Sequence, residues 1–324
     1  MRAIVIEGNS LRLREVPDPS LGPADLLVRI RATSVNRADL RRAAVHFKQS
    51  ETAAAAIAGL EMAGEVIGKG ADVSSFAIGD RVMAMTGGGY AEMVAIDHRL
   101  ALPVPAKFTW ARAAATPTVY VTAHDALVSQ GGVTAGTQLL VQGASTGTGI
   151  AAVQIAHAWK ADRVFGTAGT DDKVARLRAL GCDTPINYRT SDVAKLVLEA
   201  TQERGVDLVL DLVGRSAVAA NIAAVAIKGR IICVGRVGGT TDEINLDEFA
   251  RKRVTMTGTT FRTRTLDERT AVIRRFRNEM IPLFEDGTLT PVLDQREFGF
   301  EEAEAAQAYM AENKHFGKIV LHVR

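Results

Sequence analysis

The middle of the chain alternates short apolar segments with longer helix-forming segments, and this alternation restricts the fold more than any other feature of the sequence. Strands are predicted at 138–142, 163–167, 184–187, 207–211, 230–234 and 254–259. Helices are predicted between them, for example at 171–180 and 192–203, where acidic first turns and following glycines mark the two ends. Strands joined by helices form a parallel sheet. The predicted fold class is therefore α/β, with a doubly wound parallel sheet.

The two ends of the chain have a different pattern. Up to about residue 119, short β-prone runs such as 26–30 and 64–67 are separated by Gly and Pro, which predicts a small β-rich domain. The last stretch predicts a long helix from 267 to about 286, a short helix at 301–312 and a strand at 318–323. We expect this tail to return to the first domain.

Composition and charge narrow the range of functions. The 324 residues include 39 Lys and Arg against 37 Asp and Glu, a net charge of +2 that is too small for a nucleic-acid partner. The apolar runs are far shorter than the ~20 residues that cross a bilayer. The N-terminus is too short and strand-like for a signal peptide. We expect a cytoplasmic α/β enzyme without nucleic-acid or membrane partners.

A glycine-containing loop follows the first predicted strand of the middle region. It runs from Gly143 to Gly149 and leads into an apolar helix at 150–159. The N-terminus of a helix offers free N–H groups and a partial positive charge to a pyrophosphate. The fingerprint G-x-G-x-x-G is only partly met, because Ala144 and Thr146 replace its first two glycines. The alternative is a tight strand-to-helix turn without a ligand.

The end of the next predicted strand bears on the choice of cofactor. It continues into Gly169 and Thr170, without the Asp or Glu that would bind a ribose 2′-hydroxyl. Lys173 is a candidate donor to a 2′-phosphate, and Tyr188 a candidate wall of its pocket. This favours NADPH over NADH. The neighbouring pair 171–172 is acidic and would repel a phosphate unless it serves as first-turn helix charge, and Lys173 alone can equally be a surface charge.

A series of short segments spread over nearly the whole chain carries a family resemblance. The segments are 35–40 (VNRADL), 59–66 (GLEMAGEV), 79–82 (GDRV), 89–92 (GYAE), 122–123 (TA), the glycine loop, 211–214 (DLVG) and 317–321 (GKIVL). In this order they resemble the zinc-independent quinone oxidoreductases, the zeta-crystallin-like group of the medium-chain dehydrogenase/reductase superfamily. The resemblance implies a GroES-like catalytic domain at 1–119 and 262–324, a Rossmann domain at 120–261, and a cofactor in the cleft.

The resemblance also implies roles for individual residues. Asn36 corresponds to an asparagine near the nicotinamide and the substrate, and Thr122 to a threonine beneath the nicotinamide ring. Lys318 is either directed at the cofactor or a charge on the last strand. The implied cofactor-binding set is Asn36, Thr122, Ala144, Ser145, Thr146, Gly147, Thr148, Gly169, Thr170, Lys173, Tyr188, Val234, Gly235, Arg236, Phe261 and Arg262.

Two departures from the family pattern concern the substrate and the metal. Where the family has a Gly-x-Tyr-Pro stretch over the substrate, this chain has Phe47 beside His46, so the phenolic hydroxyl is lost. The zinc ligands of related dehydrogenases are replaced in the segments 34–36, 59–61 and 116–118, and we expect no metal. The two cysteines, Cys182 and Cys233, are expected in the core.

These observations predict hydride transfer from NADPH to a quinone or an α,β-unsaturated carbonyl. Asn36 is the first choice as hydrogen-bond donor to the substrate oxygen, and Phe47, Tyr120 and Arg262 are further catalytic candidates. Water is the expected proton source. The alternatives are an enoyl or alkenal reductase with little quinone activity and a non-catalytic, crystallin-like NADPH-binding protein. The apolar predicted strand at 254–259 favours a homodimer through the edge of the Rossmann sheet.

Overall fold

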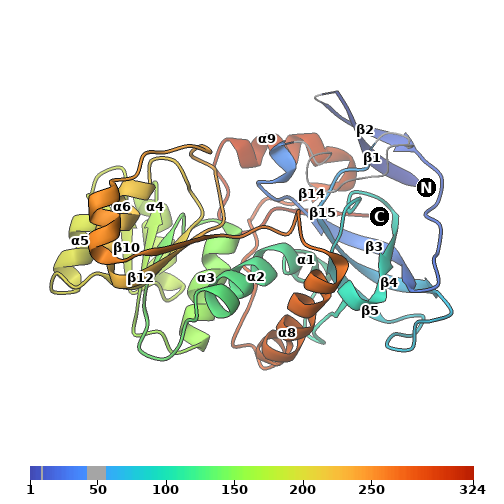
Figure 1. Cartoon of the computed structure of the whole chain (residues 1–324). Coiled ribbons are helices and arrows are strands. Elements are labelled where there is room, and N and C mark those ends of the chain that lie inside the picture. Colours follow the sequence, from blue (N-terminus) through green and yellow to red (C-terminus); the bar gives the residue numbers. More distant parts are fainter. Residues whose placement is uncertain (9, 42–55) are drawn as a thin grey trace. The chain divides into compact units, whose positions relative to one another are not determined.

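The computed structural model describes residues 1–8, 10–41 and 56–324 (Figure 1). The chain divides into two compact units, each treated separately below. The first consists of Met1–Val121 together with Arg262–Arg324, and the second of Thr122–Phe261. Among the described residues, no helix combines the length and the apolar character needed to cross a bilayer.

The first unit is built on a mainly antiparallel sheet. Its strand order is β14-β15-β3-β4-β5-β7, and β6 pairs with β3 on the side of this path, while β1 and β2 form a separate ribbon. The strands are β1 (Arg2–Glu7), β2 (Ser10–Glu15), β3 (Asp25–Ser34), β4 (Glu61–Lys69), β5 (Arg81–Met85), β6 (Met93–Asp97), β7 (Leu102–Pro103), β14 (Phe298–Gly299) and β15 (Val320–His322). Since β15 pairs antiparallel with β3, the C-terminal tail completes the sheet of the N-terminal segment.

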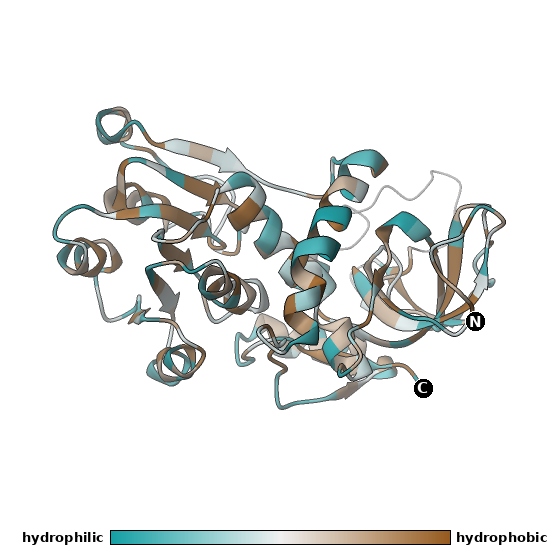
Figure 2. Ribbon diagram, turned by 90° about the horizontal axis from the view of Figure 1, so that it is seen from below, coloured by the Kyte–Doolittle hydropathy of each residue, from teal (hydrophilic) through white to brown (hydrophobic). Residues whose placement is uncertain are grey.

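The helices of the first unit cover this sheet and carry apolar faces. They are α1 (Trp110–Ala114), α8 (Leu266–Glu285) and α9 (Ala303–Ala311), and α2 (Pro117–His124) continues into the second unit with π-helical turns at Asp125–Gln130. Thr265 and Glu268 form a capping box at the start of α8. Hydrophilic and hydrophobic residues alternate along α8 (Figure 2), and its buried side chains include Phe276 and Phe284. Their spacing puts one helix face in the core.

The second unit contains a parallel sheet of order β10-β9-β8-β11-β12-β13, which confirms the predicted α/β fold class. The strands are β8 (Gln138–Gln142), β9 (Arg163–Ala168), β10 (Thr184–Asn187), β11 (Val206–Asp211), β12 (Val225–Cys233) and β13 (Thr255–Gly258). The helices between them are α3 (Gly147–Ala158), α4 (Asp171–Ala179), α5 (Val193–Ala200), α6 (Val218–Ala224) and α7 (Leu246–Lys252). Because all six strands are parallel, their carboxyl ends share one edge of the sheet, where ligands of such folds bind.

One strand differs from its prediction. β12 begins at Val225, five residues before the expected start at 230. Its pairing with β11 shifts register between Val206 and Leu208, and Lys228 has a positive φ of 65°. The polar Lys228 and the following glycine interrupt the apolar run, so the sequence pattern did not include the first half of this strand.

Candidate functional site

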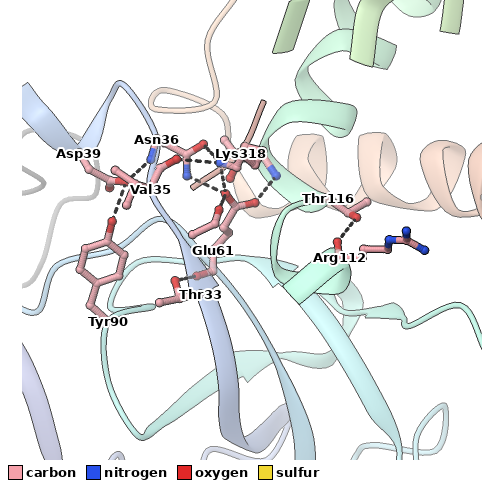
Figure 3. A network of polar contacts seen from close by, with 11 residues as sticks. Thr33, Val35, Asn36, Asp39, Glu61, Tyr90, Arg112, Thr116 and Lys318 are labelled. Atoms are coloured by element: carbon pink, nitrogen blue, oxygen red, sulfur yellow. Dashed lines mark hydrogen bonds and ion pairs between the residues drawn. The ribbon is translucent and has the colours of Figure 1, made fainter. Parts of the chain in front are cut away.

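A carboxylate with no exposed surface lies at the centre of the first unit. Glu61, the first residue of β4, is 0% exposed. Its Oε1 accepts hydrogen bonds from Asn36 Nδ2 at 2.7 Å, from Lys318 Nζ at 2.8 Å and from the Ser34 hydroxyl (Figure 3). Its Oε2 accepts from the backbone N–H of Thr118 at 2.8 Å, in the first turn of α2. We call these five residues the Glu61 cluster, and its donors compensate for the loss of water around the charge.

The ammonium group of Lys318 supplies the positive charge of this cluster. Lys318 is 4% exposed and precedes β15. Its Nζ donates to Glu61 Oε1 at 2.8 Å, to Asn36 Oδ1 at 2.8 Å and to the Val35 carbonyl at 2.9 Å, so all three of its donors are used. The sequence left Lys318 either as a cofactor contact or as a charge on the last strand, and the structure shows it as one half of a buried ion pair.

The amide of Asn36 is held between these two charges. Asn36 follows β3 and is 6% exposed. Lys318 has only donors, so it binds the amide oxygen, while ionised Glu61 has only acceptors, so it binds Nδ2. The second N–H of Nδ2 has no partner among the described residues. Within the described part of the chain, Asn36 therefore keeps one N–H that is not bound to another residue.

A second buried carboxyl lies next to the Glu61 cluster. Asp39 Oδ2 accepts from the Asn36 backbone N–H at 2.7 Å and from the Tyr90 hydroxyl at 3.2 Å. Its Oδ1 is buried without a partner in the described part of the chain. Burial raises the pKa of Asp39 to about 7, although the hydrogen bond from Asn36 and the charge of Lys318 oppose this shift. Burial and the neighbouring Asp39 also raise the pKa of Tyr90.

The other catalytic candidates lie elsewhere or cannot be placed. The ring of Tyr120 is 2% exposed, packs edge-on against Phe284 at 5.0 Å between centroids, and has a pKa raised by burial. Arg262 is exposed at the point where the chain re-enters the first unit. Phe47 and His46 lie outside the described residues. Of these candidates, the structure therefore places Asn36 alone within the Glu61 cluster.

The glycine loop of the second unit forms the expected strand-to-helix connection. Thr146 is the N-cap of α3: its hydroxyl accepts from the Gly149 N–H at 3.1 Å and donates to the Gly143 carbonyl at 2.9 Å. Thr146, which replaces a glycine of the dinucleotide-binding fingerprint, therefore stabilises the loop by bonds to Gly143 and Gly149. The N–H groups of Gly147 and Thr148 come before the first intrahelical bond, as an anion site requires.

Close packing explains the glycine that ends the loop. A Cβ at Gly149 would lie 2.5 Å from the Gly143 carbonyl oxygen and 2.6 Å from Ala144 Cα. Ala144 and Ser145 complete this segment, and the Ala144 N–H donates to the Thr167 carbonyl at 2.9 Å. The first turn of α3 thus packs directly against the loop, and such a close approach of backbone suits the binding of a pyrophosphate.

A chain of buried polar groups supports this loop from behind. The Gly143 N–H donates to the Thr167 hydroxyl at 2.9 Å, which donates to Gln142 Oε1 at 2.9 Å. Gln142 Nε2 donates to Asn221 at 2.8 Å, and Asn221 Nδ2 donates to Asp211 at 3.1 Å. The other oxygen of Asp211 accepts from two backbone N–H groups. The pKa of Asp211 is nevertheless raised by burial. The chain links the ends of three neighbouring strands, and sequence analysis missed it.

The expected 2′-phosphate residues gather at the end of β9. A Cβ at Gly169 would lie 2.8 Å from the Tyr188 hydroxyl, and Tyr188 is 51% exposed. Thr170 is the N-cap of α4 and accepts from the Lys173 backbone N–H at 3.3 Å. Asp171 Oδ1 accepts from Asn187 at 2.6 Å, so this carboxylate is engaged within the protein.

The remaining cofactor candidates lie at the ends of β12 and β13 and at the boundary of the unit. The N–H groups of Val234 and Gly235 both donate to the Asp211 carbonyl, and a Cβ at Gly235 would lie 2.0 Å from the Leu212 carbonyl oxygen. Arg236 is half-buried next to them. Thr122 and Phe261 are half-buried at the two ends of the second unit.

Residues at the former zinc-ligand positions have other roles. The Ser34 hydroxyl binds Glu61, and the Thr116 hydroxyl donates to the Arg112 carbonyl at 2.7 Å. Within the described ranges, no three His, Cys, Asp or Glu side chains are grouped so that they could hold a metal ion. Cys182 is buried, which raises its pKa to about 12, whereas Cys233 is only half-buried and the prediction that it is a core residue was too strong.

Comparison with known proteins assigns the family. One family model, described as a zinc-binding dehydrogenase, matches residues 180–321, and another, the alcohol dehydrogenase GroES-like domain, matches residues 22–106. Prostaglandin reductase-3 from Mus musculus is 31% identical over 96% of this chain and 84% of that protein. The chain belongs to the medium-chain dehydrogenase/reductase superfamily. The superfamily is the one that the sequence motifs predicted, and its quinone oxidoreductase-like members are among the relatives of this chain.

Further relatives agree with this assignment. Quinone oxidoreductase-like protein 2 from Bos taurus is 27% identical to this oxidoreductase over 97% of the chain and 89% of that protein. An alcohol dehydrogenase superfamily protein from Novosphingobium aromaticivorans has a TM-score of 0.89 and 32% identity, with both chains covered completely. Escherichia coli quinone oxidoreductase, solved with NADPH, has a TM-score of 0.88 and 23% identity over 99% of both chains, and it shows the same fold.

We expect Gly149→Ala to weaken binding of a nicotinamide dinucleotide by at least about tenfold, because the added methyl group forces the loop away from the start of α3. Fluorescence titration of the reduced cofactor measures this change. Gly299→Ala is the matched control, since its Cβ would meet only two side-chain carboxylate oxygens, at 3.4 and 3.5 Å. Equal Kd values for the two variants would contradict this account of the loop.

We expect the free energy of unfolding to fall as the pH rises from about 4 to about 7. The pKa of Asp39 is raised in the folded protein to about 7, so the fold prefers its protonated form, and this preference is lost as the carboxyl ionises. Asp39→Asn should reduce this loss by roughly 2–4 kcal/mol. Urea denaturation at a series of pH values measures it. The exposed Asp72→Asn variant should show the same dependence of unfolding free energy on pH as wild type. If Asp39→Asn also showed that dependence, Asp39 would not be its cause.

Proposed function

We propose that this oxidoreductase is an NADPH-dependent reductase of quinones or α,β-unsaturated carbonyl compounds. Bound NADPH supplies a hydride for such acceptors. One observation carries the proposal: Asn36 offers a single N–H donor from a cluster in which the other hydrogen-bonding groups of Asn36, Glu61 and Lys318 are engaged. A donor of this kind stabilises an oxygen on which negative charge develops.

In this proposal the protein contributes binding and hydrogen bonding. Asn36 Nδ2 donates to the acceptor oxygen, and the buried charges of Glu61 and Lys318 keep the amide from turning. Water supplies the proton that completes the reduction. Tyr120, packed against Phe284, and the exposed Arg262 are weaker candidates for contact with the substrate.

Three features of the second unit support NADPH over NADH. The end of β9 carries Gly169 and Thr170 in place of a carboxylate, and Tyr188 lies next to Gly169. The nearby Asp171 is bound to Asn187. The fold neighbour from Escherichia coli was solved with NADPH. The proposed cofactor-binding residues are Asn36, Thr122, Ala144, Ser145, Thr146, Gly147, Thr148, Gly169, Thr170, Lys173, Tyr188, Val234, Gly235, Arg236, Phe261 and Arg262.

A second candidate function is an alkenal or enoyl reductase with little quinone activity. Phe47 in place of a tyrosine favours it, as does the similarity to prostaglandin reductase-3. Assays of NADPH and NADH oxidation across quinones, enones and aldehydes separate the two functions. Tight NADPH binding without oxidation by any of these compounds would instead favour a non-catalytic protein.

We expect Asn36→Ala to lower kcat/KM for the best acceptor by roughly 100-fold, because the transition state loses its hydrogen-bond donor. The measurement is the steady-state rate of NADPH oxidation. Asn278→Ala, an exposed asparagine change on α8, should leave this rate unchanged. Full turnover by Asn36→Ala with every active acceptor would exclude the role assigned to Asn36.

We also propose a homodimer formed through β13. This strand is at the end of the parallel sheet, and its outer edge has no strand partner in the described part of the chain. Such an edge pairs readily with a second copy. We expect light scattering to give the mass of a dimer, and a monomer at micromolar concentration would contradict the proposal.

A further inference from the structure

Glu61 and Lys318 make hydrogen bonds beyond those that a buried ion pair needs for its own stability. Glu61 receives four hydrogen bonds, and Lys318 donates its three. Two of these bonds end on the same amide, that of Asn36, one on each polar atom. A buried charge pair needs its own lone pairs and protons satisfied, but it does not need to hold a neutral side chain from both sides.

We propose that Glu61 and Lys318 are positioning residues that lock the Asn36 amide in one orientation, so that its Nδ2 group presents a donor to the substrate. The inference rests on the proposed function for its substrate. If the amide turned by 180°, its oxygen would face the Glu61 carboxylate and its N–H₂ would face the Lys318 ammonium. Both contacts would then be repulsive in a buried setting, so one orientation is strongly preferred.

This locking has a consequence for the choice of substrate. Among the residues that the structure describes, the second proton on Nδ2 of Asn36 has no partner, whereas the amide oxygen accepts from Lys318. An oxygen that accepts, such as that of a quinone, an enone or the enolate formed from it, finds a partner there. An alcohol hydroxyl that donates would have to share the amide oxygen with the Lys318 ammonium. The cluster therefore favours reduction of conjugated carbonyl compounds over binding of alcohols.

The backbone reinforces the same geometry from the other side of the residue. The Asn36 N–H is bound to Asp39, and the carbonyl of the preceding residue, Val35, accepts from Lys318. Main chain and side chain of Asn36 are thus both fixed by buried partners. Little conformational freedom remains to be lost when a substrate oxygen binds.

The first experiment measures hydrogen exchange of the Asn36 side-chain amide and needs no assay of turnover. In wild type, the two Nδ2 protons of Asn36 should exchange with solvent at clearly different rates in NMR spectra, because one is bound to Glu61 and the other is not. Asn36→Asp assigns the signal pair by its loss. In Glu61→Gln and in Lys318→Met, where one of the two charges that hold the amide is gone, the difference between the two protons should become smaller. Equal rates in wild type would overturn the inference, whether or not the protein reduces quinones or enones.

The second experiment measures kinetics on the same variants. We expect kcat for the best acceptor to fall about 10- to 100-fold in Glu61→Gln and Lys318→Met, with less than about a twofold change in the Kd of NADPH. Lys252→Met is the matched control: it removes another buried lysine, whose Nζ binds backbone carbonyls in the second unit, and should lower stability without lowering kcat. Wild-type kcat in both cluster variants would refute the positioning role.

A double variant distinguishes a loss of amide positioning from a loss of stability. Removing one charge leaves the other buried without a partner, whereas Glu61→Gln with Lys318→Met removes both together. We expect the double variant to be more stable than Lys318→Met and still to show the lowered kcat and the smaller difference between the two proton exchange rates. A folded double variant with wild-type kcat would show that the pair serves stability alone. Failure of wild type to reduce any quinone or enone would refute the proposed function, while the exchange measurement would still decide the positioning role.

Discussion

A buried carboxylate is the constraint on which the first unit depends. Glu61 has no exposed surface, so its charge must be balanced and hydrogen-bonded within the protein. The balance comes from Lys318, which lies 257 positions later in the chain. The end of β3, the start of α2 and the segment before β15 therefore meet at one carboxylate. Fixing these segments also fixes Asn36, the residue on which the proposed chemistry rests.

The second unit also contains a buried carboxyl, Asp211, which accepts hydrogen bonds from the Asn221 amide and from two backbone N–H groups. Its glycine loop is supported by hydrogen bonds that pass through Thr167, Gln142 and Asn221 to Asp211, and all four of these side chains are buried. Thr146 caps α3 from within the loop, so the loop has hydrogen-bond partners of its own. A binding loop that is already ordered loses little entropy when it accepts a ligand.

Local patterns predicted much of the fold, and contacts between distant residues account for what they missed. The sequence located β8 and β10 with the bounds that the structure has, because strand signals lie within a few neighbouring residues. The pairing of Glu61 with Lys318 could not be predicted from local sequence, since the residues around Lys318 do not distinguish this lysine from one on the surface. Asn36 was found through its family motif, whereas Asp39 lay within the same motif and gained a role only when its burial beside Tyr90 was seen.

The pairing of Glu61 with Lys318 also sets an order of events during synthesis. The first strands of the first unit leave the ribosome long before β15 and Lys318, and the whole second unit is translated in between. Until then, Glu61 has no cation and β3 lacks β15 as a neighbour. The unit that is encoded in the middle can therefore complete its fold first, while the one that begins the chain is finished last.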